Sequence, residues 1–152
     1  MTALKKLEAR CLIMALEEEL LKMPQVELPP THTFAEGVYA RECTVPKGTL
    51  LTGMIHLQEH ICILSKGKIV IVTEDGMEIF TAPKTIRCRP GLKRVGYALE
   101  DSVWTSIHGT HETDVKVIEN TLMKPTYDEK NLLSEEELVQ LREEVCRASL
   151  QP

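Results

Sequence analysis

The sequence has no hydrophobic run of the roughly 18 residues that a membrane-spanning helix needs. Its apolar stretch near the N-terminus, residues 11–16, is short and leads directly into three glutamates. It lacks the small-residue cleavage site that an export signal would carry. These absences predict a cytoplasmic protein with no membrane partner.

Positive charge is in the minority, and two familiar functional motifs are missing. The chain carries 18 lysines and arginines against 23 aspartates and glutamates, for a net charge of −5. Nucleic-acid binding usually needs a basic face, so we expect no nucleic-acid partner. The sequence also lacks a phosphate-binding Gly-x-x-x-x-Gly-Lys-Ser/Thr loop and a Gly-x-Ser-x-Gly nucleophile elbow. Nucleotide hydrolysis and serine-hydrolase chemistry of those kinds are therefore not indicated.

Cysteines do not suggest cross-links, and large aromatic residues are scarce. The five cysteines include no Cys-x-x-Cys pair, and their number is odd. Thiols of a cytoplasmic protein usually stay reduced, so we expect buried free cysteines that pack as small hydrophobic side chains. Two Phe and one Trp are present, so the core must be mainly aliphatic.

Short β-type segments dominate the middle of the chain. Between residues 32 and 110, runs rich in Val, Ile, Thr and Tyr alternate with turn signals that contain Gly, Pro or Asp. Their spacing of about ten residues is typical of a closed antiparallel β-barrel or jelly roll. We expect a mainly β fold of this kind, with strands near 38–44, 49–56, 59–64, 68–73, 77–81, 84–88, 93–97 and 102–108.

Helical patterns flank this β region on both sides. Residues 3–22 predict a helix with two apolar stripes, and charged residues separate the stripes. After the β region the pattern turns helical again, and Ser134 with Glu137 forms a capping box before a last helix over 135–148. The predicted organisation is an N-terminal helix and linker over 1–31, a barrel over 32–110 and C-terminal helices over 111–152.

The segment from Gly48 to Gly67 combines turn glycines with side chains that bind metals in proteins. Residues two apart on a strand point to the same face, so His60 and Cys62 share one face. His56 ends the preceding strand, and the turn between the strands lets both imidazoles point into the barrel. A dry interior where polar side chains converge is usually a binding site.

This segment resembles the first motif of the cupin superfamily. That motif reads Gly, five residues, His, one residue, His, three residues, Glu, six residues, Gly. Gly48, His56 and Gly67 match it, whereas Met54 replaces the first His and His60 replaces the Glu. The resemblance implies a cupin-type antiparallel barrel with an internal pocket, although the usual metal ligands are incomplete.

The second cupin motif is only partly kept. Gly91 fits it, and Arg94 stands where a His is usual. The chain looks most similar to small single-domain cupins encoded by tailed bacteriophages and prophages, a group with no settled activity. This similarity implies the cytoplasm of a bacterial host and a homo-oligomer, most simply a homodimer. The stretches that carry it are 32–37, 49–53, 60–67 and 103–114.

A metal site is one interpretation of the histidines. Imidazole is a common ligand of divalent ions such as Zn, Fe and Ni, and His108 is the best third ligand beside His56 and His60. The alternative is that these histidines bond to each other or to water, in a pocket that binds a ligand without metal. Weaker candidates for the third ligand are Cys62, Met54 and Glu59.

Arg94 has two interpretations as well. A buried guanidinium needs an anionic partner, so Arg94 can recognise the carboxylate or phosphate of a ligand. It can instead lie at the rim and pair with Glu100 or Asp101. The side chains expected to bind a ligand are His56, His60, Arg94, Cys62, Trp104 and Tyr39.

Three functions follow from these patterns. The first is a cupin that binds a small molecule, such as an anion, without catalysis. The second is a metal-dependent enzyme with His56, His60 and His108 as ligands. The third is a phage structural or host-interaction protein that uses its terminal helices. Because a helix lying on its own barrel buries only one of two apolar stripes, the N-terminal helix also favours a homodimer. The alternative is that both stripes are covered within one protomer, between the barrel and the C-terminal helix.

Overall fold

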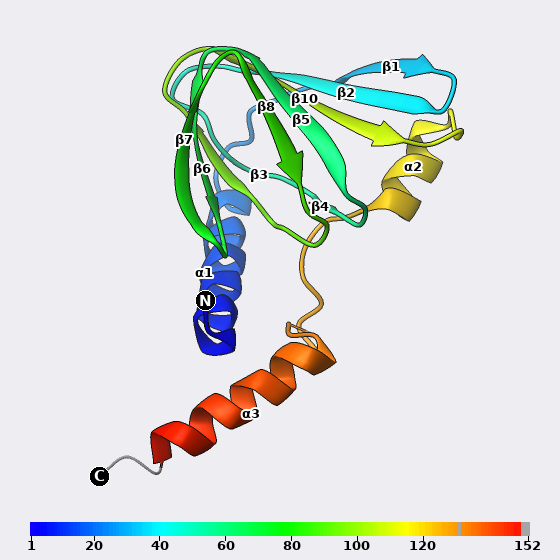
Figure 1. The fold of residues 1–152 in the computed structure, drawn as a ribbon. Helices are drawn as coiled ribbons and strands as arrows, with labels where there is room; N and C mark the ends of the chain where they lie inside the picture. The colour runs from blue at the N-terminus through cyan, green and yellow to red at the C-terminus, as the bar shows by residue number, and fades with distance from the viewer. Residues whose placement is uncertain (131, 150–152) are drawn as a thin grey trace.

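The structure is a computed structural model that describes residues 1–130 and 132–149 (Figure 1). No helix in these residues is long and apolar enough to cross a membrane. The helices are α1 (Ala3–Leu21), α2 (Val115–Leu122) and α3 (Glu135–Ser149). The strands are β1 (Thr31–Ala35), β2 (Val38–Val45), β3 (Leu50–Thr52), β4 (Ile55–His56), β5 (His60–Lys66), β6 (Lys68–Thr73), β7 (Gly76–Thr81), β8 (Lys84–Cys88), β9 (Val95–Ala98), β10 (Ser102–Gly109) and β11 (Met123–Lys124).

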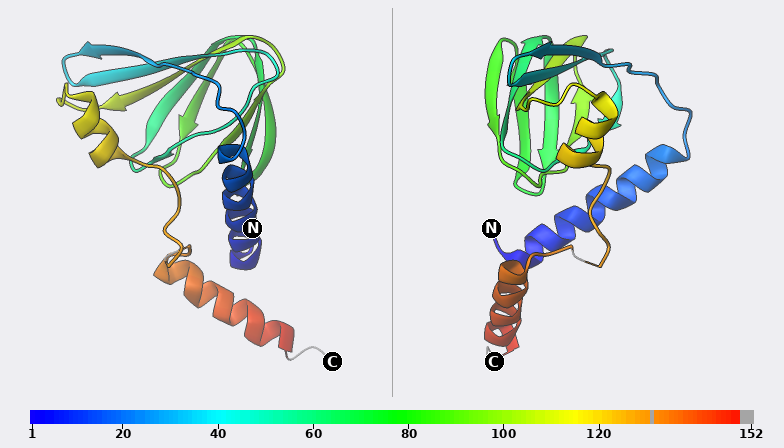
Figure 2. Two further views of the ribbon diagram at one scale, coloured as in Figure 1. Left: turned by 180° about the vertical axis from the view of Figure 1, so that it is seen from behind. Right: turned by 90° about the vertical axis from the view of Figure 1, so that its right-hand side faces the viewer.

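The strands form two large antiparallel sheets and one short ladder. The first sheet has the order β1-β2-β10-β5-β8, and the second has the order β3-β9-β6-β7. The short ladder joins β4 to β11. The two large sheets curve around a shared interior (Figure 2). The mainly β, antiparallel architecture expected from the sequence is confirmed, and it is consistent with a jelly roll.

The expected closure into a barrel is wrong. Among the described residues, no hydrogen-bonded strand pair joins the two large sheets. The reason lies in the segment 49–56, expected as one strand, which splits into β3 and β4 around Gly53. The N–H of Gly53 donates to the carbonyl of Arg94 at 2.9 Å. As a result β3 pairs with β9, whereas β4 pairs with β11 outside both large sheets.

Gly67 forms the tight connection between β5 and β6. Its φ is +85°, in the left-handed region that favours glycine, and an added Cβ would lie 2.4 Å from the carbonyl oxygen of Asp101. No side chain fits there without moving backbone. The turn therefore fixes where β5 ends, and with it the register of the inward-facing side chains of β5.

Charged residues fasten α1 to the rest of the chain. Arg10 is buried, and its guanidinium donates to Glu74 in the β6–β7 turn at 3.0 Å and to Glu137 of α3 at 2.9 Å. Farther along the helix, Glu17 pairs with the buried Lys93 at 2.6 Å. The charged strip between the two apolar stripes thus faces the body of the protein.

The two C-terminal helices have different surroundings. Ile118 of α2 packs with Tyr39 and Met123 in a buried cluster at one end of the first sheet. Figures 1 and 2 show α3 extending away from the sheets, beside the N-terminal end of α1. There the backbone N–H of Ala3 donates to Glu144 at 2.9 Å. The terminal helices therefore touch each other, while α3 leaves most of its surface uncovered.

Candidate functional site

Three histidines from three strands converge inside the β region. His56 ends β4 and His60 begins β5, and the short turn between them places the ring centroids 4.3 Å apart. β10 runs antiparallel to β5 with Ile107 opposite Ile61, which brings His108 beside His60 at 4.6 Å. His56 and His108 are 4.8 Å apart and nearly parallel. All three side chains are buried.

Hydrogen bonds orient these rings. His56 Nδ1 and His108 Nε2 lie 2.9 Å apart, so one of them donates to the other. His60 Nδ1 donates to the carbonyl of Gln58 at 3.1 Å, because a carbonyl oxygen only accepts. A neutral His60 then keeps a lone pair on Nε2, a buried atom without a hydrogen-bond partner in the described part of the chain. Metal-binding histidines are commonly held in this way, with the far N–H bonded to a carbonyl.

Burial keeps His56 and His108 uncharged at neutral pH. Burial, together with repulsion from His60, lowers the pKa of His56 to about 2 and that of His108 to about 4. Neutral imidazole is the form that binds metals. The ligand atoms of the three side chains lie within 4.8 Å of one another, so the group can hold a metal ion. The unpartnered Nε2 of His60 and Nδ1 of His108 fit that chemistry.

A second group of metal-type side chains shares His60. Cys62 lies two residues farther along β5, and Cys88 lies directly opposite His60 in β8. The three side chains are buried, and their ligand atoms also lie within 4.8 Å of one another. The neighbouring Cys88 thiol lowers the pKa of Cys62, whereas the Cys62 thiol and burial raise that of Cys88. This group can hold a metal ion as well, with two sulfur donors.

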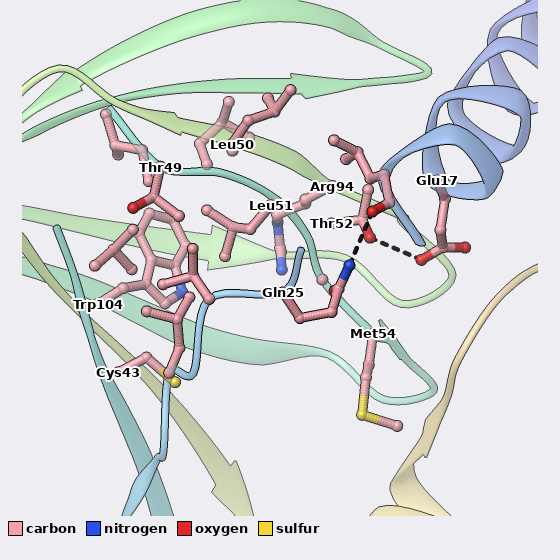
Figure 3. Close-up of a pocket in the computed structure, with 18 of the residues that line it drawn as sticks. Glu17, Gln25, Cys43, Thr49, Leu50, Leu51, Thr52, Met54, Arg94 and Trp104 are labelled. Carbon is pink, nitrogen blue, oxygen red and sulfur yellow. Dashed lines mark hydrogen bonds between the residues drawn. The ribbon is translucent and has the colours of Figure 1, made fainter. Parts of the chain in front are cut away.

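A cavity of about 710 Å³ lies between the two sheets and the end of α1. His56 and Trp104 line it, and so does Arg94, which reaches in from the segment before β9. In Figure 3 the Arg94 side chain lies between Leu51 and Gln25. Within the described residues, the Arg94 side chain forms no hydrogen bond or ion pair. A fixed positive charge therefore faces the cavity without a counter-ion from this part of the chain.

The alternative position of Arg94, at the rim and paired with an acidic neighbour, is not observed. Asp101 accepts a hydrogen bond from the backbone N–H of Lys47 at 2.8 Å instead. Glu100 is exposed on the same loop, and only its backbone forms hydrogen bonds in the described structure. The positive charge of Arg94 thus remains available to a ligand.

The end of α1 and the linker after it cover the cavity. Leu20, Met23 and Val26 are among the side chains that line this wall. Glu17 anchors the cover, since it accepts from Thr52 at 2.7 Å, as the dashed line in Figure 3 shows, and pairs with Lys93. The N-terminal segment is therefore part of the site rather than a separate appendage.

The residues predicted to bind a ligand fall into three surroundings. Three of them line the cavity, namely His56, Arg94 and Trp104. His60 and Cys62 lie in the buried metal-type groups. Tyr39 stacks on His108 at 6.3 Å, and its hydroxyl bonds to His32 at 2.7 Å, so it supports the cluster from the core.

Cys88, Glu17 and Lys93 are site residues that the sequence reasoning misses. Cys88 reaches the site because β8 pairs with β5, and nothing in the local sequence reveals that pairing. Lys93 is fully buried and pairs with Glu17. Glu17 belongs to the charged residues that separate the apolar stripes of the first helix. Its partners, Thr52 and Lys93, lie too far away in the sequence to be predicted from it.

No protein-family model and no curated protein matches this sequence. Solved structures with similar folds include a cupin-2 domain protein from Shewanella frigidimarina, at 12% identity and a TM-score of 0.46 over 62% of this chain and 92% of that chain. KdgF from Halomonas sp. is 14% identical, with a TM-score of 0.49 over 60% of this chain and 86% of that chain. A cupin superfamily protein from Desulfitobacterium hafniense is 9% identical, with a TM-score of 0.48 over 60% of this chain and 84% of that chain. Likenesses at this level carry no argument about chemistry, and none of these three comes from a phage.

Proposed function

We propose that this protein binds a small anionic molecule in its cavity, with Arg94 as the group that recognises the anion. The observation that supports this is the unpaired, half-buried guanidinium of Arg94 beside a cavity of about 710 Å³. Withdrawing a charge from water costs several kcal/mol unless a partner replaces the water. The planar guanidinium fork matches a carboxylate or phosphate, so such a group is the partner that we expect.

The cavity also limits the size and character of the ligand. Its volume lies within the range of roughly 300 to 1,000 Å³ that is common for small-molecule sites. Apart from Arg94, much of the lining is aliphatic, including Leu51, Ile69 and Met54. We therefore expect a metabolite-sized ligand with one anionic group and an apolar remainder.

Fluorescence of the single tryptophan tests this proposal. Trp104 lines the cavity and is the one Trp of the sequence, so its emission reports on ligands there. We expect at least one member of a panel of small carboxylates and phosphate esters to change the emission saturably. Arg94→Met should weaken that binding by about tenfold or more, because a charge-assisted hydrogen bond is worth roughly 1.5–3 kcal/mol.

The matched control is Arg147→Met, since Arg147 lies on α3 outside both cavities and pairs with Glu143. It should leave the affinity unchanged. Equal affinities of the wild type and a folded Arg94→Met variant would refute the role of Arg94. The absence of binding by every anion in the panel would count against the function itself.

A second candidate function is a metal-dependent enzyme that uses His56, His60 and His108. The observation that favours it is the bare Nε2 of His60, which is held in place by the Nδ1–H bond to Gln58. A divalent ion such as Zn, Fe or Ni bound there would act as a Lewis acid or activate water. Because His56 belongs both to the cluster and to the cavity wall, that chemistry would face the ligand.

Elemental analysis of the purified protein tests the metal candidate. We expect close to one transition-metal ion per chain, and His56→Gln and His108→Gln should each reduce nickel uptake by about tenfold or more. His111→Gln is the control, because His111 is exposed and outside the cluster. Metal content that is unaffected by the two cluster variants would exclude this site.

A further inference from the structure

We propose that His60, Cys62 and Cys88 form a second metal site, with two sulfur donors, that takes a thiophilic ion of the zinc or cadmium class. The site differs in donor chemistry from the three-histidine group, although the two share His60. It does not depend on anion binding at Arg94.

Strand register brings the three donors together. His60 and Cys62 are two apart on β5, so both point inward, as the exposed Ile61 between them confirms. β8 runs antiparallel to β5 and places Cys88 directly opposite His60. Cys62 and Cys88 are therefore diagonal neighbours on the inner face of the sheet. Rigid paired strands, rather than a loop, hold all the donors.

The distances suit a tetrahedral ion. Zn–S bonds of about 2.3 Å and Zn–N bonds of about 2.1 Å place neighbouring ligand atoms roughly 3.5–3.8 Å apart. The three ligand atoms here lie within 4.8 Å of one another. Small side-chain rotations close the remaining difference. Three protein donors leave one position of the ion open.

None of the donors is committed to a strong contact elsewhere. His60 Nε2 has no hydrogen-bond partner among the described residues. The contact of Cys62 Sγ with Ser106 Oγ is 3.4 Å, and Cys88 donates to the carbonyl of Ile86 at 3.7 Å. Both are long, weak thiol contacts. A buried lone pair beside two lightly held thiols is a set that a metal ion would satisfy.

The donor set selects the ion, and a second cavity gives it access. Thiolate ligands favour zinc and softer ions over the harder ions that carboxylates and water prefer. Cys88 lines a second cavity of about 400 Å³ between β7 and β8, which shares Arg94 and Trp104 with the larger cavity. An ion can therefore approach the sulfur side of His60 from the side of β7 and β8.

Cadmium titration of the full chain tests the proposal, because thiolate-bound cadmium gives an ultraviolet charge-transfer band that nitrogen ligands do not give. The exposed Cys11 and Cys146 are first replaced by Ser, and this double variant, kept reduced, is the starting protein for the titration. We expect the band to saturate at one ion per chain. Loss of a group that only supports a metal ligand weakens metal binding by about 10-fold or more. Cys62→Ser and Cys88→Ser each remove a ligand itself, so each should weaken cadmium binding by at least that factor.

Two control variants separate this site from its surroundings. Cys43→Ser removes a half-buried thiol in the larger cavity and should leave the band unchanged. His108→Gln removes a ligand of the three-histidine group alone and should also preserve the band. A band that survives Cys62→Ser together with Cys88→Ser, or that disappears in Cys43→Ser, would overturn the proposal.

A measurement on the unaltered protein covers the case in which the variants fail to fold. Bound cadmium should slow the reaction of Cys62 and Cys88 with a maleimide, as read by peptide mass spectrometry. The exposed Cys11 and Cys146 provide the internal comparison and should react equally with and without the ion. Equal labelling of Cys62 and Cys88 in both conditions would contradict the site.

Discussion

Burial decides the chemistry of individual residues in this protein. His56 and His108 are 9% and 0% exposed, and burial is the largest cause of their lowered pKa values. Their neutral rings stack and share a hydrogen bond, whereas a charged ring would lose its hydration and face two further imidazoles. His56 and His108 are therefore preformed nitrogen donors at neutral pH.

The same burial predicts that the metal-free protein loses stability in mild acid. On unfolding, His56 and His108 regain a pKa near 6.5, so below that pH the unfolded chain takes up protons that the folded chain refuses. The free energy of unfolding should fall from about pH 6.5 towards pH 4, by up to about 1.4 kcal/mol per pH unit for each histidine. Urea unfolding of the wild type and His108→Gln at several pH values measures it. The variant should show a shallower slope, and identical slopes would contradict the buried neutral state.

The alternation of side chains between the two faces of a strand is enough to predict part of the site. It places His56 and His60 together, because both flank one short turn. It does not find Cys88, which joins His60 only through the pairing of β8 with β5. It also leaves Arg94 undecided between cavity and rim, because the choice depends on where β9 lies relative to α1.

At the scale of elements, charged contacts attach α1 together with the buried Ile13. Four ion pairs run along one face of the helix, from Lys6 and Arg10 near its start to Glu17 near its end. Arg10 also lies over the ring of Tyr127, at 5.2 Å from the centroid. Burial alone would lower the pKa of Arg10. Hydrogen bonds to Glu74 and Glu137 outweigh this effect and raise the pKa of Arg10 above its usual value.

We therefore expect Arg10→Met to destabilise the protein by about 3 kcal/mol or more, because it leaves the buried carboxylate of Glu74 short of a partner. Arg10→Met combined with Glu74→Leu should recover much of that loss. Arg87→Met is the control, since the side chains of Arg87 and Glu59 are 80% and 53% exposed, and should cost under about 1 kcal/mol. Chemical denaturation measures all three, and an equal small loss for Arg10→Met and Arg87→Met would contradict the buried network.

Local pattern predicts most elements here but not their closure. The strand bounds expected over 68–73 and 84–88 agree with β6 and β8, and the capping box of Ser134 and Glu137 forms as predicted. β1 was not expected as a strand, because its pairing with β2 lies in a hairpin that follows a proline-rich linker. The prediction of a closed barrel was wrong for a related reason. Closure depends on hydrogen bonds between segments that are distant in the sequence, and a local pattern does not reveal them.

At the scale of the whole molecule, apolar side chains remain uncovered on the terminal helices. Leu12 and Leu21 lie on opposite faces of α1 and are 71% and 68% exposed, and Val145 of α3 is 57% exposed. Contiguous apolar patches are uncommon on monomers and often mark contacts between proteins. We keep the proposal that a second copy covers the face of α1 that carries Leu12, because twofold dimers are the commonest closed assembly. A host protein docked on the same helices is the alternative.

Light scattering should report a dimer at micromolar concentration. Leu12→Asp should dissociate it while leaving the circular dichroism of the protomer unchanged, because Leu12 faces solvent within one chain. Met77→Asp, on the exposed surface of β7, should leave the dimer intact. A monomeric wild type would refute the proposal, and a dimer unaffected by Leu12→Asp would place the interface elsewhere.

The most direct test of the central claim, an anion held by Arg94 in the cavity, is a crystal structure with a bound ligand. We would soak crystals with a brominated analogue of the tightest-binding carboxylate from the fluorescence panel and locate it by anomalous scattering. We expect bromine density inside the cavity and carboxylate oxygens about 3 Å from the Arg94 guanidinium. Density confined to the outer surface, or an Arg94 paired with a carboxylate of the protein itself, would contradict it.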